Sequence, residues 1–203
     1  MDFKLLSKYG ISYPKSEFVN SSKKAELAAL RLGFPLAMKI ASKNILHKTD
    51  KGGVILDIKS RQEARQAYKR LTSLSPKGKG KVLVQKMARK GAVELIMGGK
   101  KDQHFGQMIM LGMGGIFVEV FRDVTFRVCP ITEKDAIEMI SELKVYPILA
   151  GARGKKPVNK KELVSTLLKV SRLLQNEDPK EFDLNPLMAD EKACIAVDMR
   201  ILR

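Results

Sequence analysis

The sequence predicts an α+β fold made of two lobes, and three observations support this prediction. Segments with the period-2 alternation of strands come in runs, and helical segments are interspersed among them without strict alternation. This order argues against a doubly wound parallel sheet, in which strands and helices alternate. Residues 73–81 are rich in serine, glycine and lysine, which is typical of a linker. A chain of 203 residues is long enough for two small lobes, so we predict lobes of residues 1–80 and 81–203.

In the N-terminal lobe, capping residues and apolar spacing predict helices and strands in turn. Asp2 and Gly10 bracket the first helix, and the second begins at Ser21 or Ser22 and ends at Gly33. Ser60 and Glu63 form a capping box for the third helix. The helices are predicted over residues 3–9, 23–32 and 61–74, and the strands over residues 36–40 and 54–58.

The C-terminal lobe is predicted to be richer in strands. Thr132 with Asp135, and Asn159 with Glu162, start helices over residues 132–144 and 159–175. The strands are predicted over residues 82–87, 92–97, 107–111, 116–120, 124–128, 182–185 and 193–199.

The formal net charge is +16, which suits nucleic acid, anionic small molecules or an acidic partner subunit. The lysines come in small groups, aromatic residues are few, and there is no tryptophan. A stacking platform for bases is therefore unsupported, and the composition disfavours nucleic acid as a partner.

We predict a cytoplasmic protein that does not enter a membrane. No apolar run approaches the length of a membrane span, and the N-terminus lacks the apolar segment of a signal peptide. Cys129 and Cys194 lie singly in apolar, strand-like runs. Such cysteines are more typical of a reduced core than of a disulfide framework.

The segment between the first two predicted strands is the strongest candidate binding site. Lys39 lies in the middle of one strand, and the polar loop that follows contains His47 and Lys48 and ends at Gly52 and Gly53. A lysine on a strand offers a positive charge to phosphate, and paired glycines let backbone N–H groups approach anionic oxygens. An imidazole can accept a phosphoryl group and pass it on. The alternative is a hairpin with a basic tip, in which the glycines only form the turn.

Side chains with oxygen atoms gather in the last part of the chain. Alternation along a strand places Asp183 and Asn185 on one face, and Asp198 lies on the following predicted strand. Carboxylate and amide oxygens suit Mg²⁺, which also binds substrate phosphates and water. The alternative is that Asn185 and Pro186 start a turn and that Asp198 is a surface acid.

Several other polar residues allow both a binding and a structural role. Glu94 lies in an apolar strand, where a buried carboxylate needs ribose hydroxyls or a lysine as its partner; otherwise it faces outward by alternation. Arg127 and Arg153 can each hold a phosphate through two N–H donors, or serve as structural arginines. The glycine-rich turn at residues 112–115 lacks the GxGxxG pattern and favours close approach of the backbone to a ligand or another loop.

Sequence blocks in order along the chain resemble the ATP-grasp β subunits of ADP-forming acyl-CoA synthetases, and the resemblance covers roughly residues 5–202. The blocks are FPLAMKI at 34–40, HKTDKGGV at 47–54, FG at 105–106, GGIFVE at 114–119, FRV at 126–128, PIT at 130–132, YPILAGARG at 146–154 and DLNP at 183–186. Several such blocks in the same order are far more specific than any one of them.

The resemblance implies an ATP-grasp fold, with the nucleotide cleft between two α+β lobes. Members of this family make ATP from ADP and phosphate at the expense of an acyl-CoA thioester, reversibly, through phosphohistidine and with Mg²⁺. They work with a CoA-binding α subunit, whose histidine takes the phosphoryl group from an acyl phosphate. On this resemblance we expect a hetero-oligomer, and we expect that this chain does not complete the reaction alone.

The resemblance also assigns roles to individual residues. His47 would relay the phosphoryl group to ADP, and Glu94 would bind the ribose. Mg²⁺ would be held by Asn185 and Asp198, with Asp183 as a third ligand. The nucleotide-binding set is Lys39, Lys48, Gly52, Gly53, Val84, Gln85, Lys86, Met87 and Glu94.

Two other functions remain open. A noncatalytic nucleotide-sensing or assembly subunit can use the same fold, because fold does not determine function. A basic nucleic-acid-binding domain would show a steep salt dependence of binding. The sequence does not name the acyl group, since the acyl site would lie on the partner, and it does not distinguish ADP from GDP.

Overall fold

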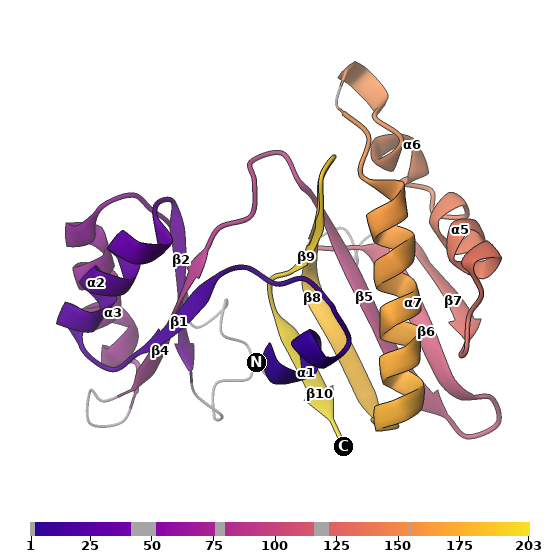
Figure 1. Cartoon of the computed structure of the whole chain (residues 1–203), viewed down its shortest axis with the longest axis horizontal. Coiled ribbons are helices and arrows are strands. Elements are labelled where there is room, and N and C mark those ends of the chain that lie inside the picture. The colour runs from indigo at the N-terminus through magenta and orange to yellow at the C-terminus, as the bar shows by residue number, and fades with distance from the viewer. Residues whose placement is uncertain (1–2, 42–51, 76–79, 116–121, 155) are drawn as a thin grey trace. The chain divides into compact units, whose positions relative to one another are not determined.

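The computed structural model describes residues 3–41, 52–75, 80–115, 122–154 and 156–203, without the side chain of Arg153. The chain forms two compact units, whose elements are labelled in Figure 1. The small unit is Pro14–Met87, and the large unit combines Met1–Tyr13 with Ala88–Arg203. Each unit has its own sheet and its own apolar core.

The small unit is an antiparallel four-stranded sheet with two helices on one face. In sheet order, the strands are β1 (Ser16–Val19), β4 (Lys81–Lys86), β2 (Leu36–Ala41) and β3 (Val54–Ile58). Helices α2 (Ser22–Leu32) and α3 (Arg61–Ser73) begin where the hydroxyls of Ser21 and Ser60 accept hydrogen bonds from backbone N–H groups, as predicted. Even-numbered side chains of β2 and β4, such as Met38 and Val84, pack against these helices, so the odd-numbered ones occupy the opposite face.

The large unit contains an antiparallel six-stranded sheet in the order β10-β8-β5-β6-β7, with β9 paired to β8. Its strands are β5 (Val93–Asp102), β6 (Gly106–Met113), β7 (Val124–Val128), β8 (Glu181–Ala189), β9 (Cys194–Ala196) and β10 (Met199–Leu202). Its helices are α1 (Phe3–Lys8), α5 (Glu133–Ser141), α6 (Tyr146–Leu149), the 3₁₀ turn η2 (Ala152–Gly154) and α7 (Lys160–Glu177).

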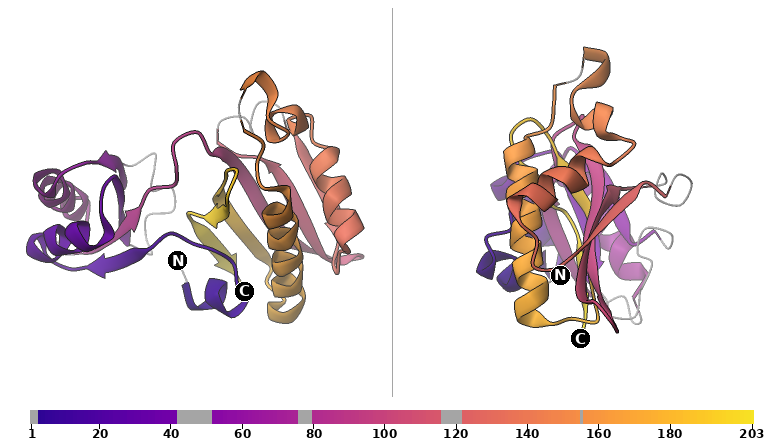
Figure 2. Two further views of the ribbon diagram at one scale, coloured as in Figure 1. Left: turned by 45° about the horizontal axis from the view of Figure 1, so that its top comes forward. Right: turned by 90° about the vertical axis from the view of Figure 1, so that its right-hand side faces the viewer.

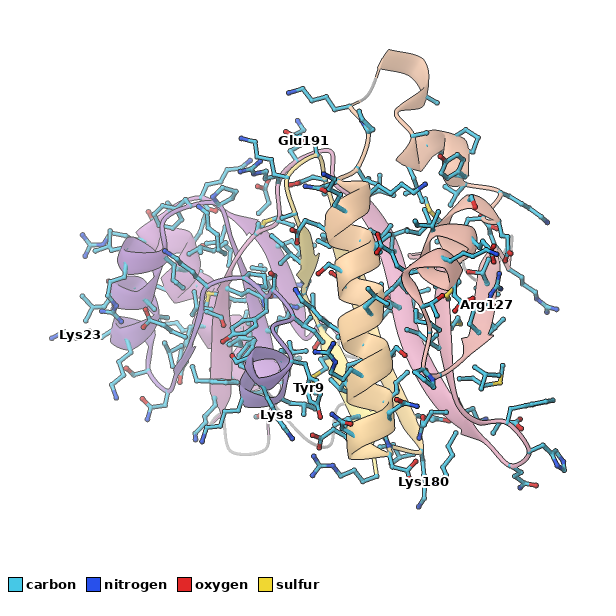
Figure 3. All side chains as sticks on the ribbon, turned by 45° about the vertical axis from the view of Figure 1, so that its right-hand side comes forward. Lys8, Tyr9, Lys23, Arg127, Lys180 and Glu191 are labelled. Atoms are coloured by element: carbon cyan, nitrogen blue, oxygen red, sulfur yellow. The ribbon has the colours of Figure 1, made fainter. Side chains whose placement is uncertain are left out.

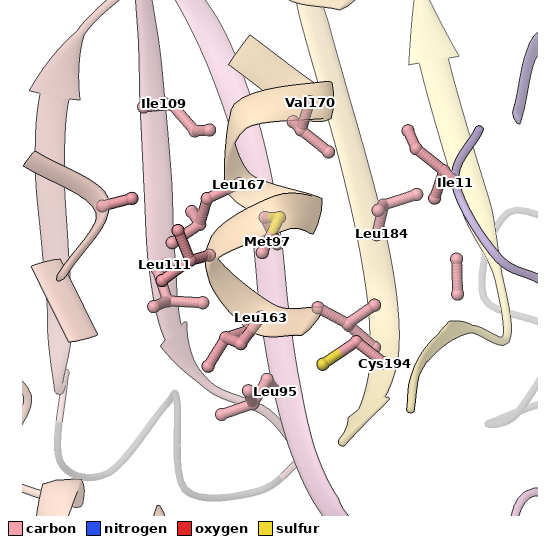
Figure 4. Close-up of a cluster of buried hydrophobic side chains, with 14 of the residues drawn as sticks. Ile11, Leu95, Met97, Ile109, Leu111, Leu163, Leu167, Val170, Leu184 and Cys194 are labelled. Carbon is pink, nitrogen blue, oxygen red and sulfur yellow. The ribbon is translucent and has the colours of Figure 1, made fainter. Parts of the chain in front are cut away.

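Helix α7 lies along one face of the large sheet, with α5 on the same side (Figure 2). Figure 4 shows its Leu163, Leu167 and Val170 pointing at the strands beneath. They meet a layer of buried side chains from β5, β6 and β8, which includes Met97, Ile109, Leu111 and Leu184. Because strand residues alternate, Glu94, Gly98 and Asp183 lie on the other face of the sheet, which we call the far face.

The units divide the chain differently from the predicted lobes of residues 1–80 and 81–203. Strand β4 pairs with β1 and β2 and so belongs to the small unit. The first residues of the chain belong to the large unit, where the N–H of Ala196 donates to the carbonyl of Ser12 at 2.8 Å. Both ends of the small unit are determined by strand pairing and hydrogen bonds between residues far apart in the chain. The composition of a linker does not reveal such pairing.

Several predicted elements change in detail. β1 was not predicted, because it is an edge strand in which only Val19 is buried. α6 and η2 were not predicted, because each is too short to show a helical period. The predicted strand at 193–199 is two strands, β9 and β10, and the predicted strand at 116–120 lies outside the described residues.

The cysteines match the prediction of a reduced core. Cys129 and Cys194 are both free and buried, and burial raises the pKa of the Cys194 thiol to about 12. In the described part of the chain, no helix is both long enough and apolar enough to cross a membrane.

Candidate functional site

Lys39 lies in the middle of β2, on the face of the small sheet turned away from α2 and α3. Its cross-strand neighbours are Val54 on β3 and Leu83 on β4. Lys39 is only 7% exposed, and Gln85, on the same face of β4, is fully buried. A buried ammonium group is costly unless anions or acceptors compensate it. This position therefore suits a lysine that meets a negatively charged group.

The end of the candidate loop is fixed beside the Lys39 strand. The carbonyl of Gly53 accepts a hydrogen bond from the N–H of Ile40 at 2.9 Å. Gly52 has φ of +68°, a backbone conformation that favours glycine. The other two predicted residues of this loop, His47 and Lys48, lie outside the described residues.

The predicted nucleotide-binding segment of residues 84–87 divides between two faces of the sheet. The side chain of Val84 is buried in the core against the helices, and its backbone lies in an inner strand that pairs with β1 and β2. Lys86 donates to the carbonyl of Phe34. Met87 accepts a hydrogen bond at its sulfur from the N–H of Asp57, at 3.1 Å. Of these four residues, Gln85 is the one that shares a face with Lys39.

Glu94, on the far face of the large sheet, lies against the glycine-rich turn. The N–H of Gly114 donates to the carbonyl of Glu94 at 2.8 Å. Gly115 has φ of +65°, and a Cβ there would lie 3.3 Å from a carboxylate oxygen of Glu94. The close backbone approach predicted for this turn is therefore present, and its neighbour is Glu94.

The predicted oxygen ligands come together at the junction of β8 and β10. Asn185 lies inside β8 rather than in a turn, and its N–H donates to the carbonyl of Asp198 at 3.2 Å. Asp183, two residues earlier, is half-buried. Burial raises the pKa of Asp183 above its ordinary value; Arg200 acts against this shift, and the nearby carboxylates Asp198 and Glu181 add to it.

This donor set fits Mg²⁺. No cluster of at least three His, Cys, Asp or Glu side chains that could hold a metal occurs among the described residues. The set here is two carboxylates and one amide oxygen, and Mg²⁺ takes few protein ligands and completes its shell with water and substrate phosphates. A cation would also compensate the negative charge of Asp183 and Asp198.

A cavity of about 510 Å³ opens beside Asp183 on the far face. Met108, Met110 and Phe126 give it an apolar wall. Gly98 lies directly opposite Asp183, and a Cβ on Gly98 would lie 2.5 Å from the carbonyl oxygen of Phe182. A side chain at position 98 would therefore displace the strand that carries Asp183.

Arg127, a candidate phosphate-binding residue, is engaged in an ion pair. Its guanidinium donates to both carboxylate oxygens of Glu142, and Glu138 lies 3.7 Å away. These contacts raise the pKa of Arg127, with Glu142 as the main cause. Figure 3 shows Arg127 on the side of α5. We therefore give Arg127 no role in the candidate site; the side chain of Arg153 lies outside the described part of the chain.

Sequence reasoning did not single out Gly98 or Arg200, which both lie opposite Asp183 on its two neighbouring strands. Their proximity follows from the pairing of β5, β8 and β10, which no local pattern encodes. The available signal was the spacing of two residues between Asp198, in the strand predicted over residues 193–199, and Arg200, which directly follows that strand.

Comparison with known proteins places this arrangement in a family. A family model described as an ATP-grasp domain matches residues 2–202. The β subunit of acetate–CoA ligase [ADP-forming] I from Pyrococcus furiosus is 43% identical over 204 residues, covering 98% of this chain and 88% of that subunit. The chain belongs to the ATP-grasp family of ADP-forming acetate–CoA ligase β subunits.

Some relatives are much longer than this chain. Acetate–CoA ligase [ADP-forming] II of Archaeoglobus fulgidus is 42% identical, and the chain spans 29% of its length. Among solved structures, acetyl-coenzyme A synthetase 1 of Ca. Korarchaeum cryptofilum, in complex with coenzyme A and Ca-AMPCP, has a TM-score of 0.91 at 38% identity. That match covers 98% of this chain and 90% of the other chain. The predicted α+β ATP-grasp fold is confirmed.

Proposed function

We propose that this chain is the nucleotide-binding β subunit of an ADP-forming acetyl- or acyl-CoA synthetase. With a CoA-binding α subunit, it would convert acyl-CoA, ADP and phosphate to the acid, ATP and CoA, reversibly. The observation that carries the proposal is the end-to-end similarity to the Pyrococcus furiosus β subunit, at 43% identity over 98% of this chain. A related synthetase was solved with coenzyme A and Mg-AMPPCP, which supports a nucleotide as the ligand here.

Two groups of residues would act on the phosphates. Lys39, held rigidly in β2, neutralises phosphate charge, and the backbone N–H groups at Gly52 and Gly53 bind phosphate oxygens. Asn185 and Asp198 would hold Mg²⁺, with Asp183 beside them; when bound, the cation supplies charge neutralisation to the phosphates. Catalysis in this proposal is mostly positioning and electrostatic stabilisation.

The remaining predicted residues would bind the nucleoside and carry the phosphoryl group. Glu94 accepts hydrogen bonds from the ribose hydroxyls, and Gln85 with the end of β4, up to Met87, lines the site of the base. An imidazole nitrogen of His47 forms a bond to phosphorus as the bond to the partner's phosphohistidine breaks. A terminal oxygen of ADP then forms the new P–O bond, the N–P bond breaks, and the imidazole is regenerated.

We also propose that the protein works in the cytoplasm. Its two free, buried cysteines are typical of a reducing compartment, and ADP and CoA are found there. The net charge of +16 suits anionic substrates or an acidic partner subunit.

The chain's two histidines allow a matched test. The purified protein is incubated with Mg²⁺ and γ-labelled ATP, as wild type, His47→Asn and His104→Asn, with and without the α partner. We expect acid-labile, base-stable label in the wild type and in His104→Asn, and none in His47→Asn. Nucleotide binding without any label, even with the partner present, would contradict phosphoryl transfer and favour the noncatalytic subunit. Absence of nucleotide binding, combined with steeply salt-dependent binding of RNA or DNA, would favour the basic nucleic-acid-binding domain.

A further inference from the structure

Arg200 lies on β10 directly opposite Asp183 on β8. Residues directly opposite each other in an antiparallel pair project from the same face of the sheet. The hydrogen bond from the N–H of Asn185 to the carbonyl of Asp198 extends this pairing toward the candidate metal ligands. Arg200 therefore projects from the far face, next to Asp183 and two residues from Asp198.

The guanidinium of Arg200 is exposed and forms no ion pair within the described part of the chain. Arg127 provides the contrast, because its guanidinium is bound by Glu142 and flanked by Glu138. A cross-strand charge pair with Asp183 would stabilise the sheet, and that is the structural alternative for Arg200. The two charges interact electrostatically, yet within the described part of the chain no direct bond joins them, and a pair with one exposed partner and no direct bond contributes little to stability.

Several carboxylates lie near Arg200, and Lys100 on β5 lies opposite one of them, Glu181. Asp183 lies directly opposite Arg200, Glu181 lies two residues before Asp183 on β8, and Asp198 lies two residues before Arg200. These carboxylates would repel a polyphosphate bound beside them, so a nearby positive charge is needed to compensate the repulsion. A guanidinium suits that task, since it is always charged and presents paired N–H donors that match phosphate oxygens.

We propose that Arg200 binds a phosphate of the nucleotide beyond the α-phosphate. The inference rests on the proposed function, because it requires nucleotide phosphates beside Asn185 and Asp198. Arg200 thereby takes the place that the sequence prediction gave to Arg127. In the nucleotide-free protein, Asp183 holds the guanidinium nearby through its charge, and the phosphate replaces it as the partner on binding.

Binding calorimetry with ADP, ATP and AMP in the presence of Mg²⁺ tests this role. We expect Arg200→Gln to weaken ADP and ATP by about 10- to 100-fold, the loss of one charged hydrogen-bonding partner. AMP lacks the phosphates in question and should change by less than about twofold. Arg200→Lys, which keeps the charge but loses the fork of donors, should fall between wild type and Arg200→Gln.

Arg172, exposed on α7, provides the matched control. Arg172→Gln removes the same charge from the other side of the sheet and should leave all three affinities unchanged. An equal loss of AMP and ADP affinity in Arg200→Gln would show a structural role and overturn the inference. If Arg200→Gln keeps the wild-type affinity for ADP while Lys39→Met weakens ADP binding, the role of Arg200 is overturned and the proposed function stands. A wild-type protein that binds no nucleotide would overturn the proposed function as well.

Discussion

The backbone N–H of Gly114 donates a hydrogen bond to the carbonyl oxygen of Glu94, at 2.8 Å. A Cβ at position 114 would lie 2.9 Å from Cγ of Glu94 and 2.9 Å from the carbonyl carbon of Leu95. Real side chains essentially never approach so closely, so either the Glu94 side chain or the backbone of β5 would have to shift. Gly114 therefore determines where the Glu94 carboxylate can lie.

The Gly114→Ala variant should lose discrimination between ADP and 2′-deoxy-ADP. If Glu94 accepts a hydrogen bond from the ribose, its displacement removes a charged hydrogen bond worth about 1.5–3 kcal/mol with ADP. The affinity for the 2′-deoxy nucleotide should fall less, because this nucleotide lacks one of the ribose hydroxyls. Glu94→Gln should show the same change in the ratio of the two affinities, and Glu191→Gln, at an exposed carboxylate, should not. Equal weakening of both nucleotides by Gly114→Ala would indicate general disruption of the sheet instead.

Replacement of Lys39 by methionine should weaken nucleotide binding with little loss of fold. Methionine has a similar length and suits a buried position, so the variant removes the charge while it keeps most of the packing. We expect the dissociation constant for Mg-ADP to rise about 10- to 100-fold, measured by calorimetry. Lys23→Met, at an exposed lysine of α2 in the same unit, is the control. Unchanged affinity in Lys39→Met would contradict a phosphate-binding role for this lysine.

The stability of the large unit should depend on pH through Glu177. Its carboxylate accepts hydrogen bonds from Lys8 Nζ at 2.6 Å and from the Tyr9 hydroxyl at 2.8 Å, both labelled residues in Figure 3. These bonds, that of Lys8 first, lower the pKa of Glu177 below its ordinary value of 4.5. Since the folded-state pKa is lowered, the stabilisation is complete above a pH of about 4.5 and is lost as pH falls through the folded-state value.

Chemical denaturation of wild type and Glu177→Gln at a series of pH values measures this contribution. The variant should be less stable than wild type at pH 7, and the difference should shrink as the pH is lowered below 4.5, the ordinary pKa of the group. A difference that stays constant down to acid pH would show that the effect of the substitution does not come from the ionised carboxylate.

Arg127 should contribute to stability and not to nucleotide binding. Its pair with Glu142 joins β7 to the end of α5 and is partly exposed. A double-mutant cycle of Arg127→Met and Glu142→Gln should give a coupling of about 0.5–1 kcal/mol in unfolding free energy. The ADP affinity of Arg127→Met should match that of wild type within about twofold. A selective loss of ADP and ATP affinity in Arg127→Met would contradict this prediction and indicate that Arg127 binds phosphate.

Local signals in the sequence were reliable where chemistry acts over a few residues. The caps at Ser21, Ser60, Thr132 and Asn159 all accept the expected backbone hydrogen bonds. Asn185 and Asp198, predicted on successive strands, do lie beside each other, because the N–H of Asn185 donates to the carbonyl of Asp198. The sequence blocks were sufficient to indicate the ATP-grasp fold before any pairing was known.

The features that were not predicted depend on partners far away in the chain. From the sequence, strand β4 was predicted to begin the second lobe, because the residues of β4 do not indicate that it pairs with β1 and β2. Arg127 and Arg200 both read as arginines in or near strands. Their roles separate only when the sheet shows which one faces α5 and Glu142 and which one faces Asp183.

The insertion of the small unit after Tyr13 has a consequence for how the protein is made. Lys8 and Glu177 are 169 residues apart, so α1 leaves the ribosome long before its partner on α7 is synthesised. The small unit is contiguous and can fold in the meantime. The core of the large unit closes only when α7 and the last strands have emerged, and Leu5 and Leu6 remain without their packing until then. During biosynthesis the inserted small unit is therefore completed before the large unit, whose two segments flank it in the sequence.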